Sequence, residues 1–161
     1  VYTVPWLLFA SKFRGWLLWN AACQFALFLP VVQIPAMKTG HMSYVDIGWP
    51  VGLVLIAINA FAFSDGQYLR RWVTFGCMLL QGGRMTLQAL INLFPYRWKQ
   101  DLPRYQYTKL RWEQKDGMPP SSWSTKMQHD IIQQACANAT FLACPLALCA
   151  FDRTPEVARL E

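Results

Sequence analysis

Four long apolar stretches limit what this chain can fold into. They cover residues 16–35, 45–63, 72–94 and 131–151, and each is close to the ~20 residues that an α-helix needs to cross about 30 Å of hydrocarbon. A soluble bundle with long core helices is the alternative, but core helices of this length usually carry a charged face. The sequence therefore predicts an all-α integral-membrane bundle, one domain over residues 1–161 with about four transmembrane helices.

The polar residues lie mainly outside these stretches. This is expected for a chain in which 54% of the residues are hydrophobic and 15% are charged. Residues 1–15 contain an apolar run that is too short to cross the membrane. We predict that they form an interfacial segment. Residues 95–130 form the one large polar segment, which we predict to be a long basic loop. Its basic residues are Arg97, Lys99, Arg104, Lys109, Arg111, Lys115 and Lys126.

Aromatic residues are interspersed with these basic ones, and the combination has two interpretations. A basic segment with aromatic side chains can bind nucleic acid. Next to membrane spans, however, Trp and Tyr are typical of the headgroup region, and Lys and Arg are attracted to anionic headgroups. We therefore expect membrane lipids as partners and no nucleic acid. The aromatic residues are Tyr96, Trp98, Tyr105, Tyr107, Trp112 and Trp123.

The cysteines and histidines predict neither a metal site nor a disulfide framework. All five cysteines fall inside the apolar stretches, no CxxC motif occurs, and the chain has two histidines, His41 and His129. We interpret the cysteines as small packing residues. They are Cys23, Cys77, Cys136, Cys144 and Cys149.

A line of polar residues runs through the third predicted span. The steps between them are three, four and four, which places them on one face of a helix; they are Gln81, Arg84, Gln88 and Asn92. Steps of four also separate Asp130, Gln134 and Asn138 in the fourth span, and Asn20 and Gln24 in the first. Because polar side chains are costly in hydrocarbon, we expect these stripes to be buried and to face one another inside the bundle.

Arg84 is the charged member of its stripe and has two interpretations. As a structural group, it pairs with the facing spans, and we expect Asn138 and Gln134 as acceptors, with Asp130 at full reach. As a binding group, a central arginine that follows two glycines suits a phosphate or carboxylate that enters the bundle. The sequence leaves both open.

Three motifs occur in an order that points to a known membrane family. They are DIGWP, with Asp46 and Trp49, then GGRM, with Arg84, and then RWKQDLPRYQYTKLRWE, with Asp101, Arg104 and Tyr105. Together they resemble the N-terminal half of the steroid 5α-reductase-like integral-membrane family, in the branch whose members often have no known function. The resemblance covers roughly residues 44–148.

The resemblance implies an enzyme that passes a hydride from NADPH to a conjugated enone of a lipid or sterol. It also implies that the cofactor is held mostly by a C-terminal half, whose His-Pro signature does not occur in this chain, and neither does GxGxxG. The loop motif departs from the family pattern at Gln100 and Pro103. For this chain alone we therefore expect no cofactor and no catalytic residue. The best phosphate-binding candidates are Arg97, Lys99, Arg104, Lys109 and Arg111, which equally suit a solvated basic loop.

Three functional hypotheses remain. The favoured one is a non-catalytic accessory subunit of a large respiratory or photosynthetic membrane complex, which binds other membrane-protein subunits through its many Trp and Phe side chains. The second is the N-terminal part of an NADPH-dependent reductase that acts on an enone lipid or sterol, and the third is a lipid-binding membrane module. The absence of an initial Met favours a processed protein of a mitochondrial or plastid inner membrane over one of the endoplasmic reticulum.

Overall fold

The computed structural model describes residues 11–93 and 100–151, and these residues form helices and connecting turns without a strand. The predicted all-α fold is therefore confirmed. The helices are α2 (Ser11–Phe28), a π-helical turn (Leu29–Gln33), α3 (Ile34–Thr39), a 3-10 turn (Met42–Tyr44), α4 (Val45–Phe63), α5 (Tyr68–Leu93), α6 (Pro103–Asp116), a second 3-10 turn (Pro120–Ser122), α7 (Trp123–Ala139) and α8 (Ala143–Phe151).

Three segments of the described chain are long and apolar enough to cross a membrane. They are Phe13–Thr39, Met42–Phe63 and Pro120–Phe151, and they include the first, second and fourth predicted spans. The third predicted span corresponds to α5, which has 26 residues but is not among these segments. The reason is its polar stripe, which lowers the apolar character of a helix that is otherwise long enough. The fourth predicted span is divided into α7 and α8 by a turn at residues 140–142.

The predicted loop of residues 95–130 is largely helical, which corrects the sequence prediction. Helix α6 begins at Pro103 because proline is well suited to a first helical position, and Leu102 before it is extended. It ends at Gly117, which has a φ of 60° and closes the helix with a hydrogen bond from Met118 N to Trp112 O of 3.0 Å. Residues 1–10 and 94–99 lie outside the described residues.

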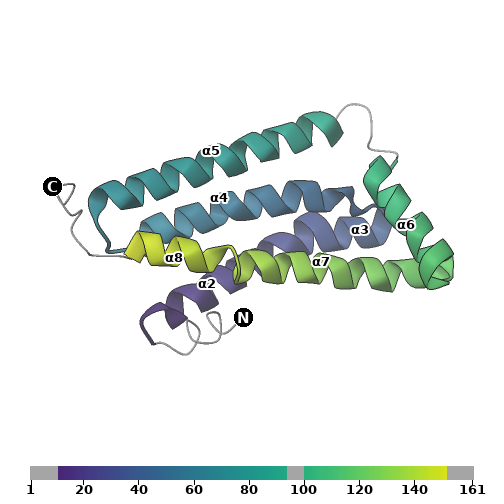
Figure 1. Cartoon of the computed structure of the whole chain (residues 1–161), viewed down its shortest axis with the longest axis horizontal. Coiled ribbons are helices and arrows are strands. Elements are labelled where there is room, and N and C mark those ends of the chain that lie inside the picture. Colours follow the sequence, from purple (N-terminus) through teal and green to yellow (C-terminus); the bar gives the residue numbers. More distant parts are fainter. Residues whose placement is uncertain (1–10, 94–99, 152–161) are drawn as a thin grey trace.

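Helix α4 is the centre of the bundle, with α5 along one side and α2 and α7 along the other (Figure 1). Three glycines permit this close packing. A Cβ on Gly48 would lie 2.2 Å from Val32 of the π-helical turn, and a Cβ on Gly82 of α5 would lie 3.0 Å from the Pro50 carbonyl oxygen of α4. The third, Gly52, faces α2 and α7. The pair Gly48 and Gly52, four residues apart, is the small-residue spacing typical of membrane helix packing.

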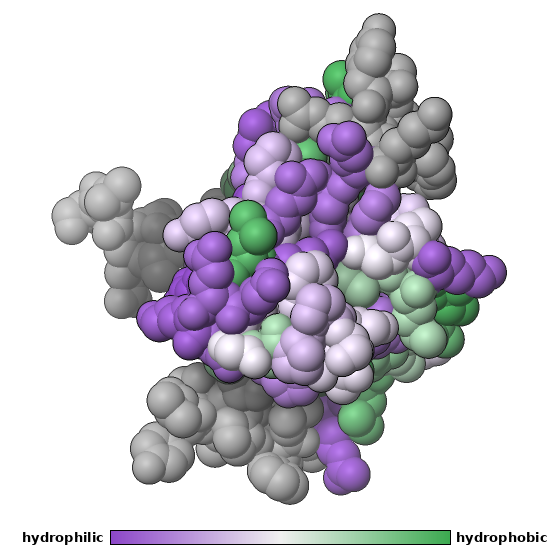
Figure 2. Space-filling view, turned by 90° about the vertical axis from the view of Figure 1, so that its right-hand side faces the viewer, coloured by the Kyte–Doolittle hydropathy of each residue, from purple (hydrophilic) through white to green (hydrophobic). Residues whose placement is uncertain are grey.

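The two ends of the bundle differ in polarity. Helix α6 lies across the end at which α4 begins and α5 ends (Figure 1), and the view onto this end is mostly hydrophilic (Figure 2). The opposite end has an apolar core in which Phe151 of α8 packs edge-on against Trp16 of α2, with ring centroids 5.8 Å apart. The α6 end is therefore where polar groups enter the bundle.

Candidate functional site

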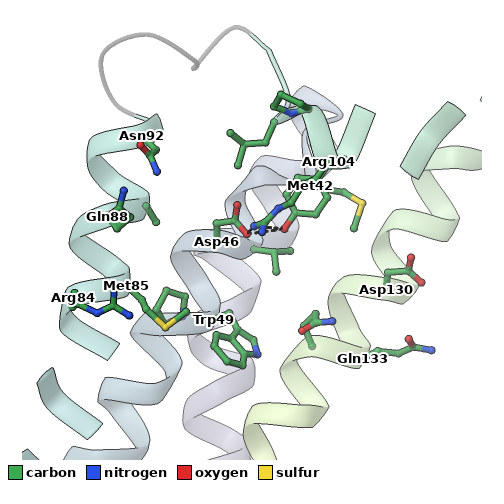
Figure 3. A pocket seen from close by; sticks show the side chains of 17 residues that line it. Met42, Asp46, Trp49, Arg84, Met85, Gln88, Asn92, Arg104, Asp130 and Gln133 are labelled. Carbon is green, nitrogen blue, oxygen red and sulfur yellow. Dashed lines mark hydrogen bonds and ion pairs between the residues drawn. The ribbon is translucent and has the colours of Figure 1, made fainter. Parts of the chain in front are cut away.

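A cavity of about 930 Å³ lies at the α6 end of the bundle. It is bordered by α4, α5 and α7 and by the first residues of α6 (Figure 3). It exists because α5 packs on α4 and α8 rather than on α7, so that α5 and α7 stay apart where α6 covers the bundle. A cavity of this size is sufficient for a small-molecule or lipid-like ligand.

One wall of the cavity is polar and comes from the predicted stripes. Helix α5 contributes Arg84, Gln88 and Asn92, and α7 contributes Asp130, Gln133 and Gln134. Figure 3 shows Gln88 and Asn92 on the cavity side of α5, with Arg84 extending toward α4. The structure thus brings together five of the nine polar residues that the sequence placed on these stripes, namely Arg84, Gln88, Asn92, Asp130 and Gln134.

The structure also corrects the prediction for these stripes. Gln81, Arg84, Gln88 and Asn92 are exposed and not buried. The last three border the space between α5 and α7, which none of the described helices fills. Gln81 does not line the cavity. Arg84 Nη2 donates to Gln81 Oε1, 3.4 Å away on its own helix, and not to the predicted acceptors Asn138 and Gln134.

Asp130 also has other partners than Arg84. Its Oδ1 accepts a hydrogen bond from Lys126 Nζ at 3.0 Å and lies 3.6 Å from His129 Nδ1. Both partners are on α7, within one helical turn of Asp130. The carboxylate of Asp130, which the sequence analysis considered as a partner for Arg84, is therefore paired within its own helix.

Apolar side chains also line the cavity. They come from α4 and α5 and are Val45, Trp49, Pro50, Met85 and Ala89. Trp49 lies between α4 and α7 in Figure 3. A cavity lined by both polar and apolar side chains suits amphipathic molecules.

A polar junction between α4 and α6 closes the end of the cavity. Asp46 of α4 forms an ion pair with Arg104 of α6, and Tyr105 Oη donates a hydrogen bond of 2.7 Å to the same carboxylate oxygen of Asp46. Arg104 Nη2 also lies 3.2 Å from Tyr105 Oη. Burial raises the pKa of Tyr105, and the positive charge of Arg104 offsets part of that rise, so the phenol is protonated at neutral pH and is a hydrogen-bond donor. Asp46, Arg104 and Tyr105, which belong to two separate motifs of the family resemblance, therefore form one junction.

Asp101 fastens the start of α6 to the start of α4. Its buried carboxylate accepts hydrogen bonds from Met42 N at 3.1 Å and Ser43 N at 3.0 Å, and one from the Ser43 hydroxyl. Lys109 Nζ donates to it at 2.7 Å and to the Gly40 carbonyl oxygen at 2.6 Å. In return, Leu102 N donates to Ser43 Oγ at 2.8 Å. The position of α6, and of Arg104 and Tyr105 on it, depends on this carboxylate.

The pKa of Asp101 reflects two opposing effects. Burial by itself would raise the pKa of the carboxyl group. The hydrogen bonds from Lys109, Ser43 and Met42, together with the charge of Lys109, outweigh burial, so the pKa lies below the ordinary value of 3.8. Asp101 is therefore ionised throughout the neutral range.

A separate cluster of amides lies in the centre of the bundle, behind the cavity. Gln24 Nε2 donates to Gly52 O at 3.0 Å, and Asn138 Nδ2 donates to Trp49 O at 3.1 Å and to Gln24 Oε1 at 3.4 Å. The cluster also includes Asn20, and Asn59 of α4 donates to its Oδ1 at 3.4 Å. The sequence singled out Asn20, Gln24 and Asn138 but missed Asn59, although a single Asn in an otherwise apolar span was a usable signal.

Two of the predicted phosphate-binding residues fasten α6 to the residues before and at the start of α4. Lys109 is paired with Asp101 and Gly40 O, and Arg104 with Asp46. Arg97 and Lys99 lie outside the described residues. The expected absence of a cofactor from residues 11–93 and 100–151 stays a prediction. In the same part of the chain, no group of three His, Cys, Asp or Glu side chains is placed to hold a metal ion.

Comparison with known proteins identifies one family. Residues 33–158 match the model of the family described as "Protein of unknown function (DUF1295)". No curated protein and no solved structure matches the chain. The matched region includes the residues that line the cavity and the α4–α6 junction, and it includes Asn59 and Asn138 of the amide cluster.

Proposed function

This chain belongs to the DUF1295 family, and we propose that its cavity binds an amphipathic, lipid-like ligand taken from the membrane. The observation that carries the proposal is the cavity itself, which is lined by polar side chains of α5 and α7 and by apolar side chains of α4 and α5. A ligand with an apolar body and a polar end matches both kinds of side chain.

Hydrogen bonding within the cavity supports this proposal. Gln88, Asn92 and Gln134 make no side-chain hydrogen bond with another described residue. Amide groups that lie between membrane helices without partners favour a ligand that brings its own donors or acceptors. Burial of an apolar chain against Trp49 and Met85 would add about 25 cal/mol for each Å² removed from water.

The proposal is tested by filling the cavity. Photoactivatable fatty acid, fatty alcohol and sterol probes are tested one by one. We expect at least one of them to label peptides that contain Trp49 or Met85. Gln88 is exposed and lines the cavity, so Gln88→Trp should fold normally and reduce that labelling at least about tenfold by occupying the space. Labelling is measured by mass spectrometry of the purified protein in nanodiscs.

The same substitution at an exposed glutamine outside the cavity is the control. Gln114→Trp on α6 should label like the wild type. Labelling that spreads over the lipid-facing surface, or that Gln88→Trp leaves unchanged, would refute binding in the cavity.

A reductase is the second candidate function, and the α4–α6 junction favours it. The family resemblance implies reduction of an enone, and Tyr105 is a protonated group at the cavity wall. Its one hydroxyl hydrogen is donated to Asp46, so it can donate to the carbonyl oxygen of a ligand by exchanging that acceptor. This hypothesis assigns the substrate side of the reaction to the described residues, because the resemblance places the cofactor mostly in a C-terminal half. A relationship of this chain to steroid 5α-reductase-like enzymes is part of the same proposal.

The reductase hypothesis predicts an effect of one hydroxyl group. In the complete protein supplied with NADPH and an enone lipid, Tyr105→Phe should lower turnover about a hundredfold, the usual loss on removing one donor to a reacting oxygen. Tyr107→Phe on the same helix, at a side chain that is 70% exposed, should leave turnover unchanged. Turnover is followed as NADPH oxidation, and equal rates for both variants or no turnover by the wild type would contradict the hypothesis.

The accessory-subunit hypothesis stays a prediction. Exposed apolar side chains such as Trp72, Leu80 and Phe141 would suit a protein partner and a lipid equally well. The predicted respiratory or photosynthetic complex and the organellar location likewise stay predictions, whereas the three apolar helical segments support a membrane protein.

A further inference from the structure

We propose that Arg84 binds the anionic head of the ligand, a carboxylate or a phosphate carried on an apolar chain. This inference rests on the proposed function, because it requires that the cavity binds a lipid-like molecule. It adds the charge of the ligand, the group that recognises it and the side from which it enters.

The charges around the cavity leave Arg84 without a countercharge. Asp46 is neutralised by Arg104, and Asp130 by Lys126. Arg84 forms no ion pair with a described acidic residue, and it donates a hydrogen bond to a neutral acceptor, Gln81 Oε1, at 3.4 Å. The lining itself holds two arginines and two aspartates, but Lys126 outside the lining neutralises Asp130. The charge of Arg84 is therefore left without a paired carboxylate, and an anion would neutralise it.

The depth of Arg84 makes that charge expensive without a ligand. It lies nine residues before Leu93, the last residue of α5, which corresponds to about 14 Å along the helix axis. An arginine at such a depth usually faces a partner or a wet cavity, because it is costly in hydrocarbon. A guanidinium group can hold both oxygens of a carboxylate or phosphate at once.

Neighbouring amides complete the binding environment. Gln88 and Asn92 follow Arg84 on the same face of α5 at steps of four, and Gln134 faces them from α7. Amide N–H groups can donate to the anion oxygens that Arg84 leaves free. One charged group with several neutral donors fits a monoanionic head better than a polyanion.

Arg84 also lies where the cavity meets the bilayer side of α5. Three exposed apolar residues lie on one side of Arg84 around the helix. They are Leu80, one turn before it, Leu87, one turn after it, and Ile91, two turns after it, and they are 76%, 60% and 61% exposed. Gln88 and Met85 lie on the other side of Arg84 around the helix and line the cavity. A lipid that enters between α5 and α7 would thus meet the guanidinium group at the entrance and place its chain against Met85 and Trp49.

The test compares two anionic probes with an uncharged one. Photoactivatable fatty acid, the fatty alcohol of the same chain length, and phosphatidic acid are offered to the protein in phosphatidylcholine nanodiscs. We expect the fatty acid or the phosphatidic acid to label peptides with Met85 or Trp49 at least about tenfold more than the alcohol. Whichever anionic probe labels more strongly identifies a carboxylate or a phosphate as the source of the charge.

Variants assign that preference to Arg84. Arg84→Gln should reduce labelling by the anionic probe to the level of the alcohol, whereas Arg84→Lys should retain most of it because the charge remains. Arg111→Gln, at an exposed arginine outside the cavity, is the matched control and should label like the wild type. Because Arg84 is exposed, its variants are expected to fold, which circular dichroism checks.

Each other outcome overturns a defined part of the argument. If the alcohol labels the cavity as well as the acid and Arg84→Gln changes nothing, the cavity binds lipid without charge recognition, so this inference fails and the proposed function stands. If no probe labels Met85 or Trp49 peptides, both fail.

Discussion

Asp101→Ala is expected to destabilise the fold by about 3 kcal/mol or more, which is the range for removing one partner of a buried ion pair. The substitution leaves Lys109 without its carboxylate, although Gly40 O still accepts one hydrogen bond from its ammonium group. It also removes the acceptor of Met42 N and Ser43 N at the start of α4. The free energy of unfolding in detergent measures the effect.

An exposed acidic residue of α6 provides the control for this substitution. Asp116→Ala at the end of α6 should leave the unfolding temperature unchanged, because Asp116 is exposed and forms no ion pair with a described residue. A loss for Asp101→Ala no larger than that of Asp116→Ala would mean that this carboxylate does not hold α6 in place.

A second variant at this position, Asp101→Asn, tests the lowered pKa of Asp101. Because the pKa is lower in the folded state than the ordinary value of 3.8, the contribution of Asp101 to stability is fully present above that value and is lost as the pH falls through the folded pKa. The difference in unfolding temperature between the wild type and Asp101→Asn should therefore be constant near neutral pH and shrink below about pH 4. A difference that grows in acid would contradict the assigned pKa shift.

The fold class was predictable from the sequence because it depends on local composition. Long apolar stretches specify helices, and the spacing of Gln88 and Asn92 after Arg84 correctly placed these residues on one helix face. Helix α6 was missed because a charged, aromatic segment has no apolar periodicity, even though its Pro103 and Gly117 are ordinary helix boundary signals.

The partners of the polar groups were not predictable in the same way. Arg104 pairs with Asp46 across 58 positions of sequence, and Asn138 bonds to Gln24 across 114. Such pairings depend on how far neighbouring helices stand apart. Arg84 was expected to reach Asn138, but α5 and α7 are separated by the cavity and Asn138 faces α2 and α4 instead. The sequence therefore predicted which residues are polar groups of the site, but not which of them touch.

The amide cluster depends on the missing side chain of Gly52, and Gly52→Ala should therefore be strongly destabilising. The added Cβ would lie 2.2 Å from Asn138 Nδ2 and 2.6 Å from Gln24 Oε1. Both amides are the ends of side chains, but they are fully buried, so moving them breaks the hydrogen bonds to Trp49 O and Gly52 O. Each buried group left unpaired typically costs about 1 to 3 kcal/mol, and we expect a loss of roughly 2 to 5 kcal/mol in the free energy of unfolding.

Two further variants separate this mechanism from a general intolerance of alanine. A Cβ on Gly76 of α5 would meet nothing within 4 Å, so Gly76→Ala should be neutral or stabilising because alanine favours helix. Asn138→Ala removes the side chain that lies closest to the new Cβ, so the double variant Gly52→Ala with Asn138→Ala should lose less stability than the sum of the two single losses. If the losses are additive, or if Gly52→Ala is as mild as Gly76→Ala, the amides do not pack against Gly52, and α2 and α7 lie further from α4 than the structure places them.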